Sequence, residues 1–333
     1  GSEMCIRDSG IGKSALLSTW FLSRFRPERA PDKFPEATED ESENHTAHKY
    51  QDISNSFALI HFIGATAESA SPIMLLRRIM LEFKQAFPKL IESEVPFKPE
   101  KIRSEFIKWL ELVSNRCKTT LVIDGLNQLE AIDGSADLSW LPVRFPINCH
   151  VILSSAGGPS LEATRLRKWP SLKIEKLRIS ERKQILVKFL DQFSKRLEST
   201  VIEKIVQVEQ TANPLFLRVM LDELRQFGEH ERLDARIEQY LKANGPEQLY
   251  IKVLKRWQTD YGADLVRNSL VLIGTSRRGL SEAEILDLLG KKSQPPEPLP
   301  RVKWTPFFLA ADSGLVSSSG VLNFAHDFLR RAV

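Results

Sequence analysis

The chain has 333 residues, which at about 100–200 residues per domain suggests two or three domains. Its hydrophobic fraction of 42% and charged fraction of 27% exclude a chain that is disordered throughout, and 16 glycines with 18 prolines are too few for a collagen-like fibre. The net charge of +4 is too small to indicate nucleic acid by itself. Three scattered cysteines favour a reducing compartment, and no apolar run approaches the about 18–20 residues that span a membrane. We therefore expect a cytoplasmic protein without membrane contact.

The first half of the chain alternates strand-like and helix-like segments. We expect a helix over residues 15–25, then a polar, proline-containing loop or insertion over 26–55. The predicted elements that follow are a strand over 56–63, helices over 72–87 and 100–113, and strands over 119–124, 150–155 and 172–177. The continuous apolar run that ends at Asp124 is typical of a parallel strand buried on both faces. This alternation predicts a doubly wound α/β sheet.

From residue 180 onward the pattern becomes helical. The predicted helices cover residues 181–193, 200–210, 214–227, 232–241, 247–261, 263–274, 281–289 and 302–311. Two short strands, 314–316 and 320–323, precede a last helix over 326–332. Helices followed by a small hairpin indicate a winged-helix domain. We expect three domains: a nucleotide-binding domain over 1–178, a helical domain over 179–245 and a winged-helix domain over 246–333.

The segment Ser9-Gly-Ile-Gly-Lys-Ser14 matches the end of the phosphate-loop pattern G-x-x-x-x-G-K-[ST]. Its glycines let backbone N–H groups point at phosphate oxygens, Lys13 supplies a mobile cation, and the Ser14 hydroxyl can ligate Mg²⁺. The nucleotide-binding candidates are Ser9, Gly10, Ile11, Gly12, Lys13, Ser14 and Ala15. The first glycine of the pattern is replaced by Arg7, and we expect the strand before the loop to be missing. The alternative is a glycine-containing helix N-cap.

Asp124 ends the apolar run 121–123 and is followed by Gly125. A carboxylate at the end of a strand is the Walker B arrangement, and we expect Asp124 to face Mg²⁺ beside the phosphate-loop strand. The alternative is an aspartate that simply begins a turn with Gly125.

The beginning of the chain has an unusual sequence. Met4–Ser9 matches, residue for residue, the translation of a transposon end used in sequencing libraries. We expect these residues to be a library artefact, and the chain to be a fragment of a longer protein. The alternative is a natural N-terminus that matches by chance.

Five segments together resemble NACHT-type signal-transducing NTPases of the STAND class, in particular the nephrocystin-like and telomerase-associated subgroup. They are SGIGKSALLSTW (9–20), LIHFIGATAESASPIMLLRRI (59–79), LVIDGLNQLE (121–130), TANPLFLRVMLDELR (211–225) and FAHDFLRRAV (324–333). The resemblance implies that the three domains close around ADP, and that exchange for ATP opens the chain and exposes assembly surfaces. It also implies ATP/ADP and Mg²⁺ as cofactors, protein partners through flanking effector and repeat domains, and a homo-oligomer in the ATP-bound state.

The resemblance also assigns residue roles. Lys13 and Ser14 take the phosphate and Mg²⁺ roles and Asp124 the metal role, while Pro214 resembles the proline that lines the adenine pocket. His326 resembles the winged-helix histidine that contacts the ADP β-phosphate in the closed state. For both Pro214 and His326 a purely structural role is an equal alternative.

The position that often carries a second acid in this class, three residues after the first, is Asn127 here. An amide cannot accept a proton at neutral pH, so we expect slow hydrolysis unless Glu130 supplies the base. Asn127 and Glu130 are therefore the catalytic candidates. The predicted strand 150–155, which is the fourth when the missing first strand is counted, ends in Ser154 and Ser155 with no arginine, which weakens the case for a γ-phosphate sensor there.

The leading functional hypothesis is a conformational switch driven by ATP and ADP, with weak ATPase activity. The first alternative is a replication-initiator-like AAA+ ATPase whose winged helix grips DNA. Such proteins usually carry a second acid directly after the Walker B aspartate, where this chain has Gly125, and the winged-helix segment lacks a dense basic cluster. Nucleic acid is therefore not an expected partner. The second alternative is a scaffold that binds nucleotide only for structural integrity.

Overall fold

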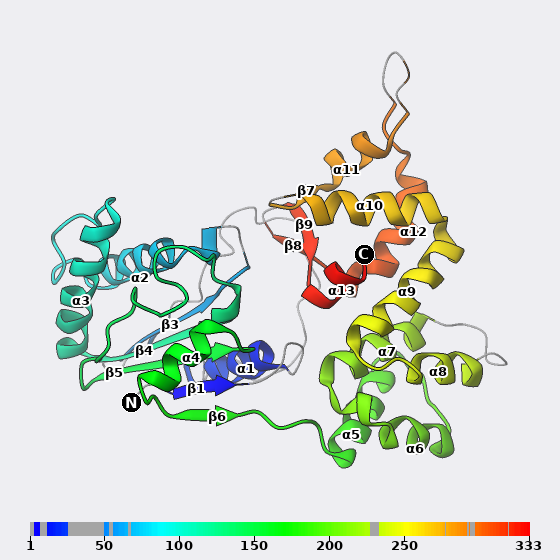
Figure 1. Ribbon diagram of the computed structural model, residues 1–333, viewed down its shortest axis with the longest axis horizontal. Coiled ribbons are helices and arrows are strands. Elements are labelled where there is room, and N and C mark those ends of the chain that lie inside the picture. The colour runs from blue at the N-terminus through cyan, green and yellow to red at the C-terminus, as the bar shows by residue number, and fades with distance from the viewer. Residues whose placement is uncertain are drawn as a thin grey trace. The chain divides into compact units, whose positions relative to one another are not determined.

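A computed structural model describes residues 3–6, 12–25, 50–52, 56–65, 68–226, 233–276, 278–291, 293, 297–318 and 320–333 (Figure 1). The chain separates into two compact units, Gly1–Ile174 and Glu175–Val333, and each is described by itself. Within the described part, no helix is both long and apolar enough to cross a membrane.

The first unit is built on a six-stranded sheet with the order β2-β3-β4-β5-β1-β6. The strands are β1 (Glu3–Ile6), β2 (Tyr50–Asp52), β3 (Ser56–Phe62), β4 (Lys118–Asp124), β5 (Cys149–Ser155) and β6 (Ser171–Lys173). Only the edge strand β2 is antiparallel to its neighbour, and the other pairs run parallel. The carboxyl ends of β1, β3, β4, β5 and β6 therefore meet at one edge of the sheet, where parallel sheets place their ligands.

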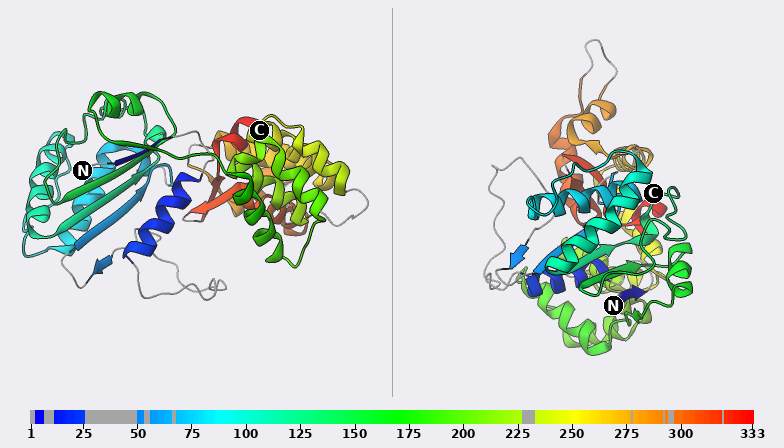
Figure 2. Two further views of the ribbon diagram at one scale, coloured as in Figure 1. Left: turned by 90° about the horizontal axis from the view of Figure 1, so that it is seen from below. Right: turned by 90° about the vertical axis from the view of Figure 1, so that its left-hand side faces the viewer.

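Helices cover both faces of this sheet (Figure 2). Helix α1 (Lys13–Phe25) packs Leu17 and Phe21 against Ala58, Ile60 and Val122 on one face. Helices α2 (Pro72–Ala86) and α3 (Pro99–Arg116) cover the other face, where they meet the alternate strand residues in a larger apolar cluster. Successive side chains of a strand point to opposite faces. This two-sided burial explains why β3 and β4 each contain a run of consecutive apolar residues, 57–60 and 121–123.

The prediction that the first strand is missing is wrong. β1 lies between β5 and β6, with Cys5 opposite Ser154 and Ile6 opposite Ser155. A parallel ladder is formed by backbone N–H and C=O groups, so a short segment without a long apolar run can occupy this place. β5 also separates β4 from β1, so the strand that carries Asp124 is not the direct neighbour of the phosphate-loop strand.

Other sequence-based boundaries agree with the structure to within a few residues, with some differences. The predicted loop 26–55 contains the short strand β2, while residues 26–49 and 53–55 lie outside the described part of the chain. β6 ends at Lys173, four residues before the predicted end. Helix α4 (Pro159–Leu166) was not predicted. Such short elements carry too few residues to show a period.

The second unit is mainly helical. Its helices are α5 (Ile179–Asp191), α6 (Ser199–Gln207), α7 (Pro214–Gln226), α8 (Leu233–Leu241), α9 (Pro246–Tyr261), α10 (Ala263–Thr275), α11 (Glu282–Leu289), α12 (Arg301–Ala311) and α13 (Asp327–Ala332). A three-stranded antiparallel sheet has the order β7-β9-β8, with β7 at Leu280–Ser281, β8 at Leu315–Ser318 and β9 at Val321–Phe324. One apolar cluster runs from Leu186 to Leu329 through this unit. The boundaries predicted at 178/179 and 245/246 stay predictions.

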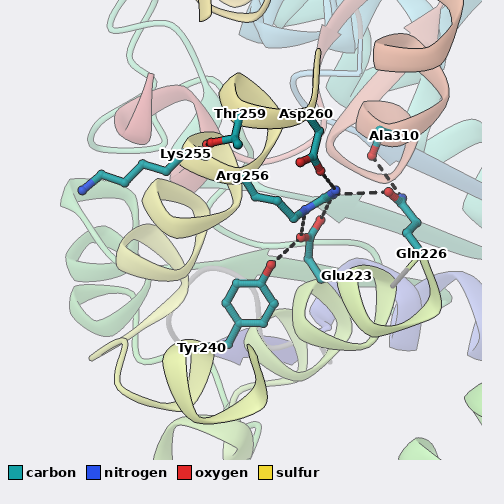
Figure 3. Close-up of polar contacts among 8 residues, drawn as sticks. All are labelled: Glu223, Gln226, Tyr240, Lys255, Arg256, Thr259, Asp260 and Ala310. Carbon is teal, nitrogen blue, oxygen red and sulfur yellow. Dashed lines mark hydrogen bonds and ion pairs between the residues drawn. The ribbon is translucent and has the colours of Figure 1, made fainter. Parts of the chain in front are cut away.

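A buried polar network joins four helices of this unit (Figure 3). Arg256 on α9 donates two hydrogen bonds to the Glu223 carboxylate on α7, of 2.6 and 2.8 Å, and a third of 2.8 Å to Asp260. Tyr240 on α8 donates to Glu223 at 2.6 Å. Burial, followed by the Glu223 charge, raises the pKa of Tyr240, so its hydroxyl stays protonated and available as a donor. Gln226 extends the network to α12 by donating to the Ala310 carbonyl at 3.2 Å.

Candidate nucleotide-binding site

The start of α1 lies at the edge where the parallel strands end. Gly12 has φ +82°, a left-handed conformation that favours glycine, and its carbonyl accepts from the Leu16 N–H at 2.9 Å. A Cβ at this position would meet nothing within 4 Å, so backbone conformation rather than space favours glycine here. The helix therefore begins directly after Gly12. Its first-turn N–H groups and its positive dipole end are the usual elements of a phosphate site.

The first turn of α1 contacts the carboxylate predicted for the metal. The Ser14 hydroxyl donates to Oδ2 of Asp124, although the two residues are 110 positions apart. Asp124 is 6% exposed and Lys13 is 8% exposed. The two motifs identified in the sequence thus lie together, with Lys13 next to the hydroxyl–carboxylate pair.

The second oxygen of Asp124 is bound by a residue from the neighbouring strand. Ser154, near the end of β5, donates its hydroxyl proton to Oδ1 of Asp124 and accepts from the Gly125 N–H at 2.9 Å. Ser154 is fully buried. Each oxygen of the Asp124 carboxylate therefore has its own hydroxyl partner.

Asn127 connects two loops at this edge. It lies in the 3₁₀ turn Leu126–Gln128 after β4, and its Oδ1 accepts from the Ala156 N–H, after β5, at 2.8 Å. The amide oxygen already has one protein donor, and the Asn127 side chain is exposed, so its NH₂ group and the second lone pair of its oxygen are open to a ligand. The predicted role of Asn127 toward attacking water stays a prediction.

Glu130, the other catalytic candidate, lies at the end of the same loop. Its side chain is exposed, and its backbone N–H donates to the Ala70 carbonyl at 2.9 Å. Among the described residues, no hydrogen bond or ion pair involves its carboxylate. Its catalytic role is untested by this geometry.

The structure does not test the remaining predicted residues at this site. Ser9, Gly10 and Ile11 lie outside the described residues, and Ala15 is exposed in the first turn of α1. Pro214 and His326 belong to the second unit, so the structure does not describe their distance from the phosphate loop. Their adenine and β-phosphate roles stay predictions.

Within the second unit, both residues lie at helix starts. Pro214 is the first residue of α7, and Oδ1 of Asn213 accepts from the Leu215 and Phe216 N–H groups at 2.9 and 3.2 Å. This is an N-cap with proline at N1. His326 precedes α13, and burial lowers its pKa, an effect that Asp327 opposes.

The sequence analysis missed a buried histidine beside this edge. His61 on β3 is 2% exposed, its Nδ1 accepts from the Arg78 guanidinium, and its Nε2 lies 3.1 Å from the Ser69 carbonyl. Arginine can only donate, so Nδ1 must be the acceptor and Nε2 carries the proton. Burial is the main cause that lowers the pKa of His61 to about 4, so the ring is neutral at physiological pH.

The donor set fits Mg²⁺ held jointly with a nucleotide. Magnesium prefers oxygen ligands and is usually bound by one or two carboxylates together with phosphates and water. Ser14 and Asp124 supply a hydroxyl and a carboxylate next to a helix N-terminus. Among the described residues, no cluster of three or more His, Cys, Asp or Glu could hold a metal ion without a nucleotide.

Comparison with known proteins gives relatives at low identity. No family profile matches the chain. It is 30% identical over 367 residues to a TPR repeat-containing protein of Dictyostelium discoideum and 24% identical over 294 residues to human nephrocystin-3. These alignments cover 98% and 85% of this chain but only 20% of each relative. The mouse telomerase protein component 1 is 24% identical over 70% of this chain and 9% of its own length. The chain thus spans a small part of the relatives it matches.

Among solved structures, the chain is similar to a Walker-type ATPase of Pyrococcus abyssi, with 12% identity, a TM-score of 0.46, and coverage of 99% of this chain and 90% of that one. It is also similar to the Aeropyrum pernix Orc1 protein in complex with DNA, with 13% identity, a TM-score of 0.44, and coverage of 100% and 86%. Likenesses this distant transfer no function. The topology of this chain itself, with β1 in a parallel sheet, a helix that begins directly after Gly12 and a carboxylate that ends β4, defines a P-loop ATPase-like fold.

Proposed function

We propose that the first unit binds ATP and ADP with Mg²⁺, and that the chain works as a conformational switch with slow ATP hydrolysis. The observation that carries this proposal is the contact between the Ser14 hydroxyl and the Asp124 carboxylate, directly after Lys13 at the start of α1. A phosphate–metal site accounts for both motifs and for their contact.

Each group has a definite task in this proposal. The first-turn N–H groups of α1 and the Lys13 ammonium bind the phosphate oxygens. The Ser14 hydroxyl and the Asp124 carboxylate hold Mg²⁺, which supplies positive charge to the β- and γ-phosphates. Phosphoryl transfer depends mainly on such positioning and charge, and this set of groups would supply both.

Hydrolysis needs one further group that takes the proton of the attacking water. At the position expected for it, Asn127 is an amide whose oxygen already accepts from the Ala156 N–H. Glu130 is exposed and stays a candidate. We therefore propose slow turnover, in keeping with a switch that holds one nucleotide for a long time.

The switch part of the proposal rests on the resemblance to NACHT-type STAND proteins and on the layout of the second unit. Elements α10, β7, α11, α12, β8 and β9 follow one another with the sheet order β7-β9-β8, which supports a winged helix after a helical domain. The relatives include a TPR repeat-containing protein many times longer than the aligned segment. We propose that the protein is cytoplasmic and binds protein partners through flanking domains like those of the longer relatives. We also propose that the ATP-bound form assembles into a homo-oligomer.

DNA remains a second candidate partner. The expectation that nucleic acid is not a partner finds no support in the structure. Helix α12 carries the basic residues Arg301 and Lys303 on its exposed side. A switch without DNA affinity predicts no salt-dependent duplex binding, whereas an initiator-like ATPase predicts binding that falls steeply with salt. A structural scaffold predicts nucleotide binding without turnover.

The test of nucleotide binding is calorimetric titration of Mg·ADP, Mg·ATP and adenosine into the wild-type chain and Lys13→Ala. A hydrogen bond to a charged group is worth about 1.5–3 kcal/mol, so the variant should bind both nucleotides about 10- to 100-fold more weakly. Adenosine, which has no phosphates, should be unaffected. Lys108→Ala, which removes an exposed lysine of α3, is the matched control. Equal weakening of nucleotides and adenosine, or no nucleotide binding by the wild type, contradicts the proposal.

A further inference from the structure

Ser154 contacts the Asp124 carboxylate, although it belongs to neither the phosphate-loop motif nor the Walker B motif. It lies at the end of β5, the strand between β4 and β1, and is fully buried. Its hydroxyl makes two hydrogen bonds, as donor to Oδ1 of Asp124 and as acceptor from the Gly125 N–H at 2.9 Å. Both partners belong to the end of the neighbouring strand and the turn that follows it.

The proton count shows what Ser154 can do. A serine hydroxyl has one proton to donate, and here that proton goes to the carboxylate. None is left to donate to a phosphate oxygen, and the buried side chain has no exposed surface toward a ligand. A hydrogen bond to an ionised acceptor is roughly twice as strong as one between neutral groups. Ser154 therefore acts on Asp124 and not on the nucleotide.

We propose that Ser154 is a positioning residue that holds the Asp124 carboxylate in the orientation required for Mg²⁺. By binding Oδ1, it leaves Oδ2 directed at Ser14 and the start of α1. The bond from Gly125, which has φ +87°, fixes the serine in turn. This role rests on the proposed function, because it concerns the metal of the same site.

The energetic consequence concerns the metal and not the nucleotide alone. A carboxylate that is already oriented loses less conformational freedom when Mg²⁺ binds, so affinity for the metal complex rises. Without Ser154, Asp124 could rotate away from Ser14. The binding of nucleotide without metal does not use Asp124 and should be unaffected.

Ser155 provides a matched control on the same strand. It is also fully buried, but its hydroxyl donates to the Gly157 carbonyl at 2.9 Å and accepts from the Gly157 N–H at 3.3 Å. Its loss removes an equally buried hydroxyl at the same edge without touching Asp124. A general effect on folding should therefore appear in both alanine variants.

The experiment measures ADP affinity by calorimetry with excess Mg²⁺ and with EDTA, for wild type, Ser154→Ala, Ser154→Thr and Ser155→Ala. A bond to a charged group contributes about 1.5–3 kcal/mol, so Ser154→Ala should lower the Mg²⁺-to-EDTA affinity ratio by about tenfold or more. Its affinity in EDTA should stay within about twofold, as expected for a group that does not contact the nucleotide. Ser154→Thr, which keeps the hydroxyl, should restore the ratio, and Ser155→Ala should leave it unchanged.

Three results overturn this role without overturning the proposed function. They are a Ser154→Ala ratio equal to that of the wild type, a fall of both Ser154→Ala affinities by the same factor, and a fall of the ratio in Ser155→Ala. A wild-type chain that binds no ADP under either condition overturns the proposed function itself, and the role of Ser154 with it. The same series in an Arg7→Gly background provides a second, independent measurement.

Discussion

Acidification should destabilise the first unit through His61, a buried neutral ring between Arg78 and the Ser69 carbonyl. In the unfolded chain His61 titrates near 6.5, whereas burial, the largest cause, lowers its pKa to about 4 in the folded protein, with the Arg78 charge adding to the effect. The unfolded state therefore takes up the proton first. The stabilising contribution of the neutral ring is complete above pH 6.5 and is lost as the pH falls toward 4.

The magnitude follows from the two pKa values. Complete titration corresponds to about 3.4 kcal/mol. Between pH 7.5 and 5.0 the unfolded ring becomes protonated while the folded ring stays neutral, which costs about 2 kcal/mol of unfolding free energy. Glu82, on α2 with Arg78, keeps a compensating charge nearby.

The assay is hydrogen exchange followed by mass spectrometry on peptides from β3 and β4, at pH 7.5 and 5.0, with exchange rates corrected for intrinsic pH dependence. His61→Gln keeps an acceptor for Arg78 and a donor for Ser69 but does not titrate in this range. The wild type should lose about 2 kcal/mol more opening free energy than the variant over this interval. Equal losses in the two proteins would refute the assignment of a buried neutral histidine.

Three further predictions concern other residues. Asn127→Asp should raise ATP turnover by about 10²-fold, measured by phosphate release, because a carboxylate can accept the water proton; a flat rate, with turnover abolished by Glu130→Gln, would make Glu130 the base. Arg7→Gly should tighten ADP binding in a titration, since the phosphate-loop pattern has glycine there and an arginine side chain hinders the turn; unchanged affinity would show that Arg7 does not weaken nucleotide binding. Glu223→Gln should destabilise the second unit by about 3 kcal/mol in urea unfolding, because the buried Arg256 loses its doubly hydrogen-bonded carboxylate partner and keeps only Asp260; a loss no larger than that of Lys255→Ala, an exposed lysine on the same helix as Arg256, would contradict this.

The fold was predictable where side chains carry a period. The apolar runs of β3, β4 and β5 and the amphipathic helices α2, α3 and α9 agree with their predicted segments within a few residues. β1 was not predictable, because the place it occupies is defined by backbone hydrogen bonds to strands far along the chain. The short α4 likewise showed no period.

Some residues of the candidate site could be predicted from sequence motifs, and others could not. The glycine-lysine-serine motif and the end of an apolar run indicated Ser14 and Asp124, and the structure brings the two together. The partnership of Ser154 with Asp124 joins residues 30 positions apart, and that of His61 with Arg78 joins a strand to a helix 17 positions on. Such contacts depend on the register of neighbouring strands and on helix packing, and residue spacing alone does not contain that information.

The network around Glu223 also constrains how the chain is made in the cell. A ribosome releases α7 and α8 before α9, so Glu223 and Tyr240 emerge before Arg256 has been synthesised. Domains fold as units during synthesis, and a carboxylate is costly to bury without its counter-ion. Helices α7 and α8 therefore have to keep Glu223 in water until α9 follows. During translation, helices α7 and α8 therefore depend on α9 to complete the apolar cluster that they share.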